Sequence, residues 1–179
     1  MEFAYELKIP KERIAVLIGK DGEIKQELED ATKVSMNIDS KEGDITLTGE
    51  DSIKIYSLRE VVKAIGRGFN PEIAKLLLKQ DYALEVLPLM DYVKNKGHLE
   101  RIKGRVIGAN GKSRETIEHL TQTYICVYGK TISIIGLPED IVIAKKAVES
   151  LLQGSPHSNV YRWLEKNMKK RKQQEIADW

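Results

Sequence analysis

The chain has 179 residues, of which 41% are hydrophobic and 31% charged, and its formal net charge is +2. This composition is typical of a globular protein and excludes an intrinsically disordered chain. No apolar run reaches the length of a transmembrane helix, and the N-terminus lacks the pattern of a signal peptide. We therefore expect a cytoplasmic protein without a membrane partner.

Residue types that carry catalysis or bind metals are sparse. Cys126 is the single cysteine, and three scattered histidines offer no zinc-ligand spacing. No paired carboxylates and no Ser/His/Asp set stand out. The sequence therefore predicts a protein that is not an enzyme and that has no metal site and no cofactor.

The charge is distributed unevenly. Residues 1–50 contain 12 acidic and 7 basic side chains, whereas residues 51–179 contain 15 acidic and 22 basic ones. A polyanion would prefer the second part. The alternative is that both parts simply present solvated charged faces.

Hydrophobic periodicity in the first half predicts the order strand, helix, glycine turn, helix, strand, strand, helix. Alternation of apolar residues indicates half-buried strands at 3–9, 34–38 and 45–47. Helical spacing indicates helices at 11–18, 24–31 and 51–65. The turn is Gly19-Lys20-Asp21-Gly22. Next comes a connector in which Pro71 predicts the first position of a short, strongly apolar helix.

The same order then recurs, with an offset of 89 residues between the glycine turns. Strand 84–89, whose Pro88 indicates an exposed edge, is followed by an insertion at 91–97. The second turn is Gly108-Ala109-Asn110-Gly111. At this offset Leu28 aligns with Ile117 and Met36 with Ile125, which indicates an internal duplication. The tail from Gly154 is strongly basic, and it is either a solvated terminal helix or an arm along a nucleic-acid backbone.

The glycine turns fail two phosphate-binding patterns. A P-loop that ends in Gly111-Lys112-Ser113 would need glycine where Val106 stands, and the only Gly-x-Gly, at 66–68, is soon followed by Pro71. A Gly-x-x-Gly turn between two short helices instead resembles the type I KH domain, βααββα, which clamps about four nucleotides of single-stranded RNA. We expect an α+β protein with two such domains, each a three-stranded sheet with helices on one face.

The predicted domains are residues 1–68 (first KH domain), 69–82 (helical connector), 83–153 (second KH domain) and 154–179 (basic tail, a C-terminal helix). The second turn carries no charge and is followed by basic residues, whereas the first contains Asp21. We therefore expect the second domain to be the main RNA binder. Its predicted contacts are the turn, nearby cations and an apolar groove: Gly108, Ala109, Asn110, Gly111, Lys112, Arg114, Lys103, Arg105, Val106, Ile107, Ile117 and Ile125. The secondary site is Gly19, Lys20, Asp21 and Gly22.

Further segments resemble a specific family, the two-KH-domain ribosome-biogenesis proteins related to partner-of-Nob-one. They are residues 64–71, 104–108, 111–114, 127–131 and 154–158. The intact first turn and the start at the first strand make the likeness archaeal in type. The resemblance implies binding to the 3′-end region of small-subunit rRNA during ribosome maturation. It also implies three protein partners: the translation initiation factor two alpha subunit, the rRNA dimethyladenosine transferase and the 3′-end endonuclease. A protein–protein adaptor and a general KH-type mRNA regulator are the alternatives.

Overall fold

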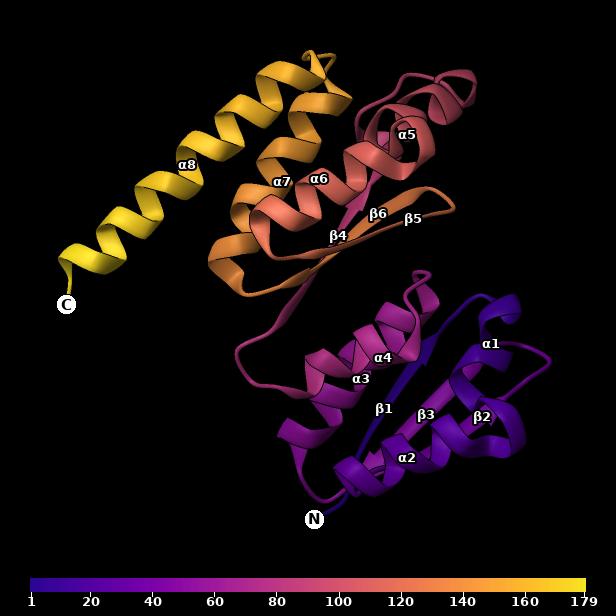
Figure 1. Ribbon diagram of the computed structural model, residues 1–179. Coiled ribbons are helices and arrows are strands. Elements are labelled where there is room, and N and C mark those ends of the chain that lie inside the picture. The colour runs from indigo at the N-terminus through magenta and orange to yellow at the C-terminus, as the bar shows by residue number, and fades with distance from the viewer. The chain divides into compact units, whose positions relative to one another are not determined.

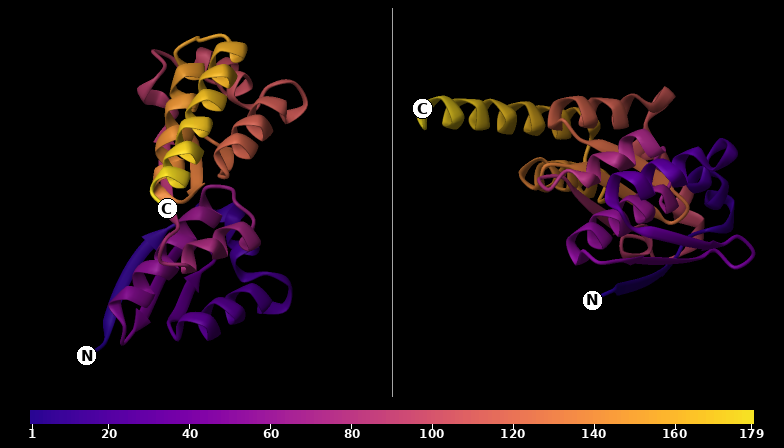
Figure 2. Two further views of the ribbon diagram at one scale, coloured as in Figure 1. Left: turned by 60° about the vertical axis from the view of Figure 1, so that its left-hand side comes forward. Right: turned by 90° about the horizontal axis from the view of Figure 1, so that it is seen from below.

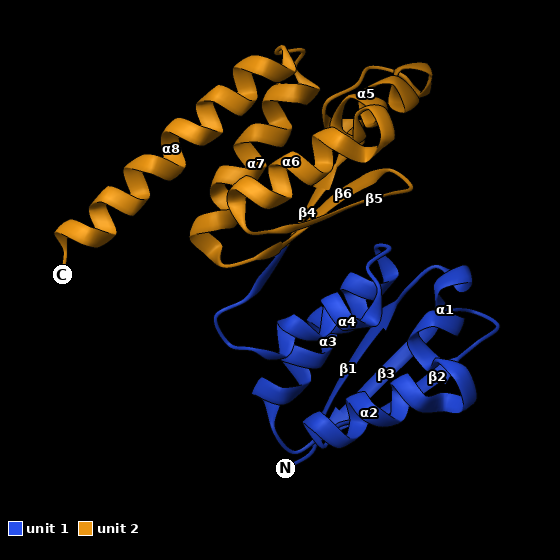
Figure 3. Ribbon diagram, in the orientation of Figure 1, with its two compact units in different colours: residues 1–84 blue, residues 85–179 orange.

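The computed structural model describes residues 1–179, and the chain divides into two compact units, residues 1–84 and 85–179 (Figure 1, Figure 3). Each unit contains one three-stranded antiparallel sheet, and helices cover one face of that sheet (Figure 1). The predicted fold class, an α+β protein built from a repeated βααββα order, is confirmed.

In the first unit every predicted strand and helix is present. The strands, in sheet order β1-β3-β2, are β1 (Phe3–Lys8), β2 (Ser35–Asp39) and β3 (Asp44–Gly49). The helices are α1 (Lys11–Ile18), α2 (Glu23–Thr32) and α3 (Ser52–Gly66), with the short turn η1 (Lys20–Gly22) between α1 and α2.

The strand β1 is more exposed than the alternating pattern predicted. Phe3 and Tyr5 are each 38% exposed, and Leu7 alone is partly covered. The reason is position: β1 pairs only with β3 and forms an edge of the sheet. Arg59 of α3 lies 5.0 Å from the ring centroid of Tyr5, so part of the contact is cation–π rather than apolar packing.

The connector residues pack as part of the first unit. α4 (Pro71–Ala74) begins with Pro71 as predicted, and the side chain of Asn70 accepts a hydrogen bond from the amide of Ile73. The following turn η2 (Lys75–Leu78) buries Leu77. Lys75 donates to Glu27 of α2 at 2.6 Å, which ties the connector to the helix that follows the first glycine turn.

The second unit repeats the arrangement and adds one long helix. Its strands, in sheet order β4-β6-β5, are β4 (Ala83–Pro88), β5 (Tyr124–Tyr128) and β6 (Thr131–Gly136). The helices are α5 (Leu99–Ile107), α6 (Lys112–Thr121), α7 (Pro138–Leu152) and α8 (His157–Ala177). Single turns are η3 (Leu89–Asp91), η4 (Lys96–His98) and η5 (Ala109–Gly111). Pro88 ends an edge strand, as predicted.

In each unit an arginine of the first helix binds carbonyl groups at the end of the helix that follows the third strand, α3 in the first unit and α7 in the second. Arg13 donates to the carbonyls of Ile65 and Phe69, and Arg105 donates to those of Leu151 and Ser155. Each arginine therefore joins the first helix of its unit to the C-terminal turn of that later helix and to the loop after it. The two arginines stand at different positions relative to their glycine turns, so the duplication has kept the contact and not the residue position.

The basic tail forms α8, which packs on α6 and α7. Val160 and Leu164 are buried, and Arg171 pairs with Asp140 at the start of α7. The turns that follow Arg171 are exposed, and α8 extends past the helices it packs on (Figure 2). None of the helices combines the length and apolar character needed to cross a membrane.

Candidate nucleic-acid interface

The second glycine turn links the C-terminus of α5 to the N-terminus of α6 through left-handed backbone. Gly108, Asn110 and Gly111 have φ angles of 76°, 55° and 75°. Glycine adopts this region freely, and Asn is among the few other residues that do so at low cost. Three of the four turn residues therefore have positive φ, and α6 begins directly after them.

The two glycines of this turn serve different purposes. A Cβ on Gly108 would lie 2.6 Å from the Cβ of Ser113, so Gly108 is required for the turn to pack against its own helix. A Cβ on Gly111 would meet no atom within 4 Å. The space beside Gly111 is open, and a ligand backbone can approach the protein backbone there.

The start of α6 provides favourable electrostatics for an anion. No side chain caps this helix, and Gly111 is its N-cap residue. Unpaired amides and the helix dipole at such an end attract phosphate groups. Lys112 is exposed and forms no ion pair, so its charge is available to the same ligand. Ala109 and Asn110 are exposed beside it.

The other residues predicted to contact RNA in the second domain are paired with protein groups or buried. Arg105 is held by the end of α7, and Lys103 pairs with Glu100 at 3.4 Å. Arg114 pairs with Glu118 and donates to the carbonyl of Ile125. The predicted groove residues belong mostly to the core: Val106, Ile117 and Ile125 are buried, and Ile107 is half-buried. Their place in RNA binding stays a prediction.

The first glycine turn has the same backbone geometry as the second but differs in side-chain charge. Gly19, Asp21 and Gly22 have φ angles of 76°, 55° and 76°, which match the second turn within a degree. A Cβ on Gly22 would also meet nothing within 4 Å. The difference is charge, because Asp21 is an exposed carboxylate at the position that Asn110 occupies in the second domain.

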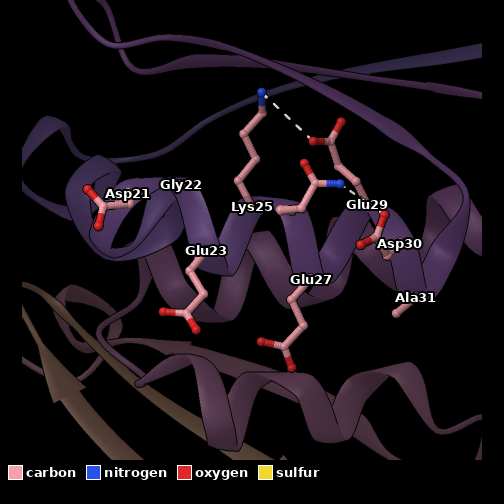
Figure 4. A pocket seen from close by; sticks show the side chains of 9 residues that line it. Asp21, Gly22, Glu23, Lys25, Glu27, Glu29, Asp30 and Ala31 are labelled. Atoms are coloured by element: carbon pink, nitrogen blue, oxygen red, sulfur yellow. Dashed lines mark hydrogen bonds and ion pairs between the residues drawn. The ribbon is translucent and has the colours of Figure 1, made fainter.

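The helix that follows the first turn extends this negative surface. α2 contains four acidic residues and one basic residue, whereas α6 contains two of each. A shallow pocket on α2 begins at Asp21 and is lined by Glu23 and Glu27, which point to the same side of the helix (Figure 4). Lys25 pairs with Glu29 at 3.8 Å, so the one cation of α2 is partly neutralised. Acidic residues thus outnumber basic ones from Asp21 through α2, although Lys20 of the turn is an exposed cation and Glu27 pairs with Lys75.

One contact that recurs in both halves of the chain was not predicted from the sequence. Glu29 accepts a hydrogen bond from the amide of Met36 at 3.0 Å, and Glu118 accepts one from the amide of Ile125 at 2.9 Å. Both glutamates obey the 89-residue offset, as do the residues whose amides they bind. Each joins the helix after the glycine turn to the next strand, and comparison of the two halves for acidic residues could have found it.

Two family models match the chain. The second KH domain of PNO1, described as a eukaryotic type KH domain of type I, matches residues 83–169, and the general KH domain matches residues 4–67. The chain is 45% identical to KH domain-containing protein MJ0443 from Methanocaldococcus jannaschii, over 97% of this chain and 78% of that protein. The chain belongs to the PNO1 and Dim2p family of two-KH-domain proteins.

Other members of the PNO1 and Dim2p family match it in sequence and structure. A crystal structure of the a/eIF2alpha-aDim2p-rRNA complex from Pyrococcus horikoshii contains a chain that is 45% identical, with a TM-score of 0.90 and coverage of 94% of this chain and 96% of that one. Pre-rRNA-processing protein PNO1 from Debaryomyces hansenii is 31% identical, over 87% of this chain and 64% of that protein. The predicted family and its archaeal likeness are thereby confirmed.

Proposed function

We propose that this protein binds single-stranded RNA from the 3′-end region of small-subunit rRNA during ribosome maturation, in the cytoplasm and without catalysing a reaction. The observation that carries the proposal is the second glycine turn, which is open at Gly111, free of charge and followed by exposed Lys112. A KH domain clamps about four nucleotides with such a turn. The family supports rRNA as the ligand, because a member was crystallised in a complex with rRNA.

The second domain is proposed as the main binder on electrostatic grounds. The two turns offer equivalent backbone, so the difference between them comes from charge. A carboxylate about 4 Å from a phosphate costs about 1 kcal/mol even in water. Asp21 and the acidic residues of α2 therefore favour a weak RNA contact, or a protein-docking role, for the first domain.

The proposed protein partners have unequal support. The alpha subunit of translation initiation factor two is supported by the complex of a family member, which contains a/eIF2alpha. The rRNA dimethyladenosine transferase and the 3′-end endonuclease are supported by the family resemblance alone.

The proposal is tested by titrating the full chain with a labelled oligonucleotide of the rRNA 3′ end and with an unrelated single strand of equal length. We expect preference for the rRNA strand and an affinity that falls with salt, with a slope near −0.7 per phosphate contact. Equal affinity for both strands would favour the mRNA regulator. An affinity that does not change with salt would favour the protein–protein adaptor.

A further inference from the structure

The long helix α8 carries an unbalanced set of charges. Residues 157–174 contain six basic side chains and a single acidic one, Glu165. Arg171 is the only one of the six that forms an ion pair, with Asp140 of α7. The other five are exposed and have no ion pair: Arg162, Lys166, Lys169, Lys170 and Lys172.

Four of these cations form one stripe on the outer side of α8. At about 100° per residue, Arg162, Lys166 and Lys169 lie within about 40° of the direction opposite buried Leu164. Lys170 lies directly beside them. The buried side of the helix is held by Val160, by Leu164 and by the pair of Arg171 with Asp140. We call Arg162, Lys166, Lys169 and Lys170 the α8 stripe.

Repulsion between the cations of the α8 stripe favours the binding of a polyanion. Arg162 and Lys166, and Lys166 and Lys170, are spaced four residues apart, where like charges destabilise a helix by a few tenths of a kcal/mol each. Only Glu165 offers an opposite charge at this spacing, to Lys169. A solvated helix usually mixes the two signs on its outer face. Bound phosphates would remove the repulsion.

The start of α8 contacts the last turn of α5, the helix that leads into the second glycine turn. The Nε2 atom of His157 is 2.8 Å from the carbonyl oxygen of Arg105, three residues before Gly108. Arg105 also donates to the carbonyl of Ser155, immediately before α8. α8 then runs beside α6, the helix that follows the turn (Figure 1). Its 21 residues span about 31 Å, far more than the glycine turn itself.

We propose that the α8 stripe binds the phosphate backbone of nucleotides that flank those clamped at Gly108–Gly111. The RNA site of the second domain then has two parts, the glycine turn and the stripe. The inference rests on the proposed function, because it requires RNA at the turn. Lysine and arginine side chains in this pattern recognise charge and not sequence, so the stripe adds affinity and salt dependence without specificity.

The test uses the full chain with Arg162, Lys166, Lys169 and Lys170 all replaced by Gln, called the stripe variant. Its matched control replaces four exposed, unpaired lysines of the first unit by Gln, which changes the net charge equally: Lys11, Lys33, Lys41 and Lys54. Each protein is titrated with a short RNA of about four nucleotides and with a long RNA of about 16 nucleotides that contains it. Circular dichroism verifies that both variants remain folded.

We expect the stripe variant to lose tenfold or more affinity for the long RNA, to keep wild-type affinity for the short RNA, and to show a salt slope reduced by about 0.7 for each lost contact. The control variant should bind both RNAs as the wild type does. Unchanged affinity of the stripe variant for the long RNA, or an equal loss for both RNAs, would overturn the inference alone. Failure of the wild type to bind either RNA would overturn the proposed function as well.

Discussion

At the scale of single residues, Asn110 and Asp21 are the informative pair. Both adopt the left-handed conformation, with φ of 55° and ψ of 29° and 25°. The first turn thus shows that an aspartate is compatible with this geometry. A substitution between the two residue types changes charge and leaves the backbone conformation available, which separates electrostatics from folding.

Asn110→Asp should weaken RNA binding about fivefold while the stability of the protein stays within about 0.5 kcal/mol of the wild type. The reason is repulsion between the new carboxylate and the clamped phosphate. The measurement is an RNA titration together with thermal unfolding. Asp21→Asn is the matched control and should leave the affinity of the full chain nearly unchanged. A larger effect from Asp21→Asn than from Asn110→Asp would contradict the assignment of the main site.

Arg105→Gln should act on stability. Its guanidinium loses hydrogen bonds to the carbonyls of Leu151 and Ser155, and hydrogen bonds from charged groups contribute about 1.5–3 kcal/mol. We expect a loss of about 2 kcal/mol in the free energy of unfolding, measured by denaturant titration. Well below the melting temperature, RNA affinity should be close to wild type. Arg13→Gln in the first unit should cost a similar amount, and a selective loss of RNA binding in Arg105→Gln would show that this arginine contacts RNA.

The sequence predicted the residues of the two glycine turns. It could not show which of the basic residues near the second turn are free to contact RNA. Residue type shows that Arg105, Arg114 and Lys112 are cations. Only tertiary contacts show that Arg105 and Arg114 are engaged with carbonyls and with Glu118, whereas Lys112 is unpaired. Likewise, Val106, Ile117 and Ile125 have the apolar character of a groove, and burial shows that they belong to the core.

At the scale of elements, strands and helices follow the sequence periodicity closely because each amphipathic segment faces one core. The exposed edge strand β1 is the exception, since a period of two does not tell how far a helix covers the strand. The basic tail is a second element whose packing the sequence did not determine. Its charge left two interpretations open, and the burial of Val160 and Leu164 shows that its first turns are packed.

Lys75→Gln tests the link between the connector and α2. Burial lowers the pKa of Lys75, but hydrogen bonds and charge from Glu27 and Glu72 outweigh it, so the pKa lies above its ordinary value of 10.5. The stabilisation is therefore complete below about pH 10.5 and is lost as the pH rises through the folded pKa.

We expect Lys75→Gln to lower the free energy of unfolding by about 0.5–1 kcal/mol at neutral pH, because Glu27 and Glu72 are largely exposed. The difference from the wild type should shrink at strongly alkaline pH. Denaturant titrations over that pH range measure it. A difference that grows with pH would contradict this sign.

At the scale of the whole molecule, the duplication is the property that the sequence revealed most fully. The offset of 89 residues aligns the glycine turns and also Glu29 with Glu118, which bind equivalent strand amides. The two copies differ, however, in the charge of their side chains. One copy has acidic residues after its turn, and the other has an unpaired Lys112 and a basic terminal helix. The two halves therefore share a scaffold and differ in their proposed ligands.

The most direct test of the central claim is ultraviolet crosslinking of the full chain to the rRNA 3′-end oligonucleotide, followed by mass spectrometry of the crosslinked peptides. We expect crosslinks concentrated in residues 103–114. Crosslinks concentrated instead in residues 19–31, around the acidic first turn, would contradict it.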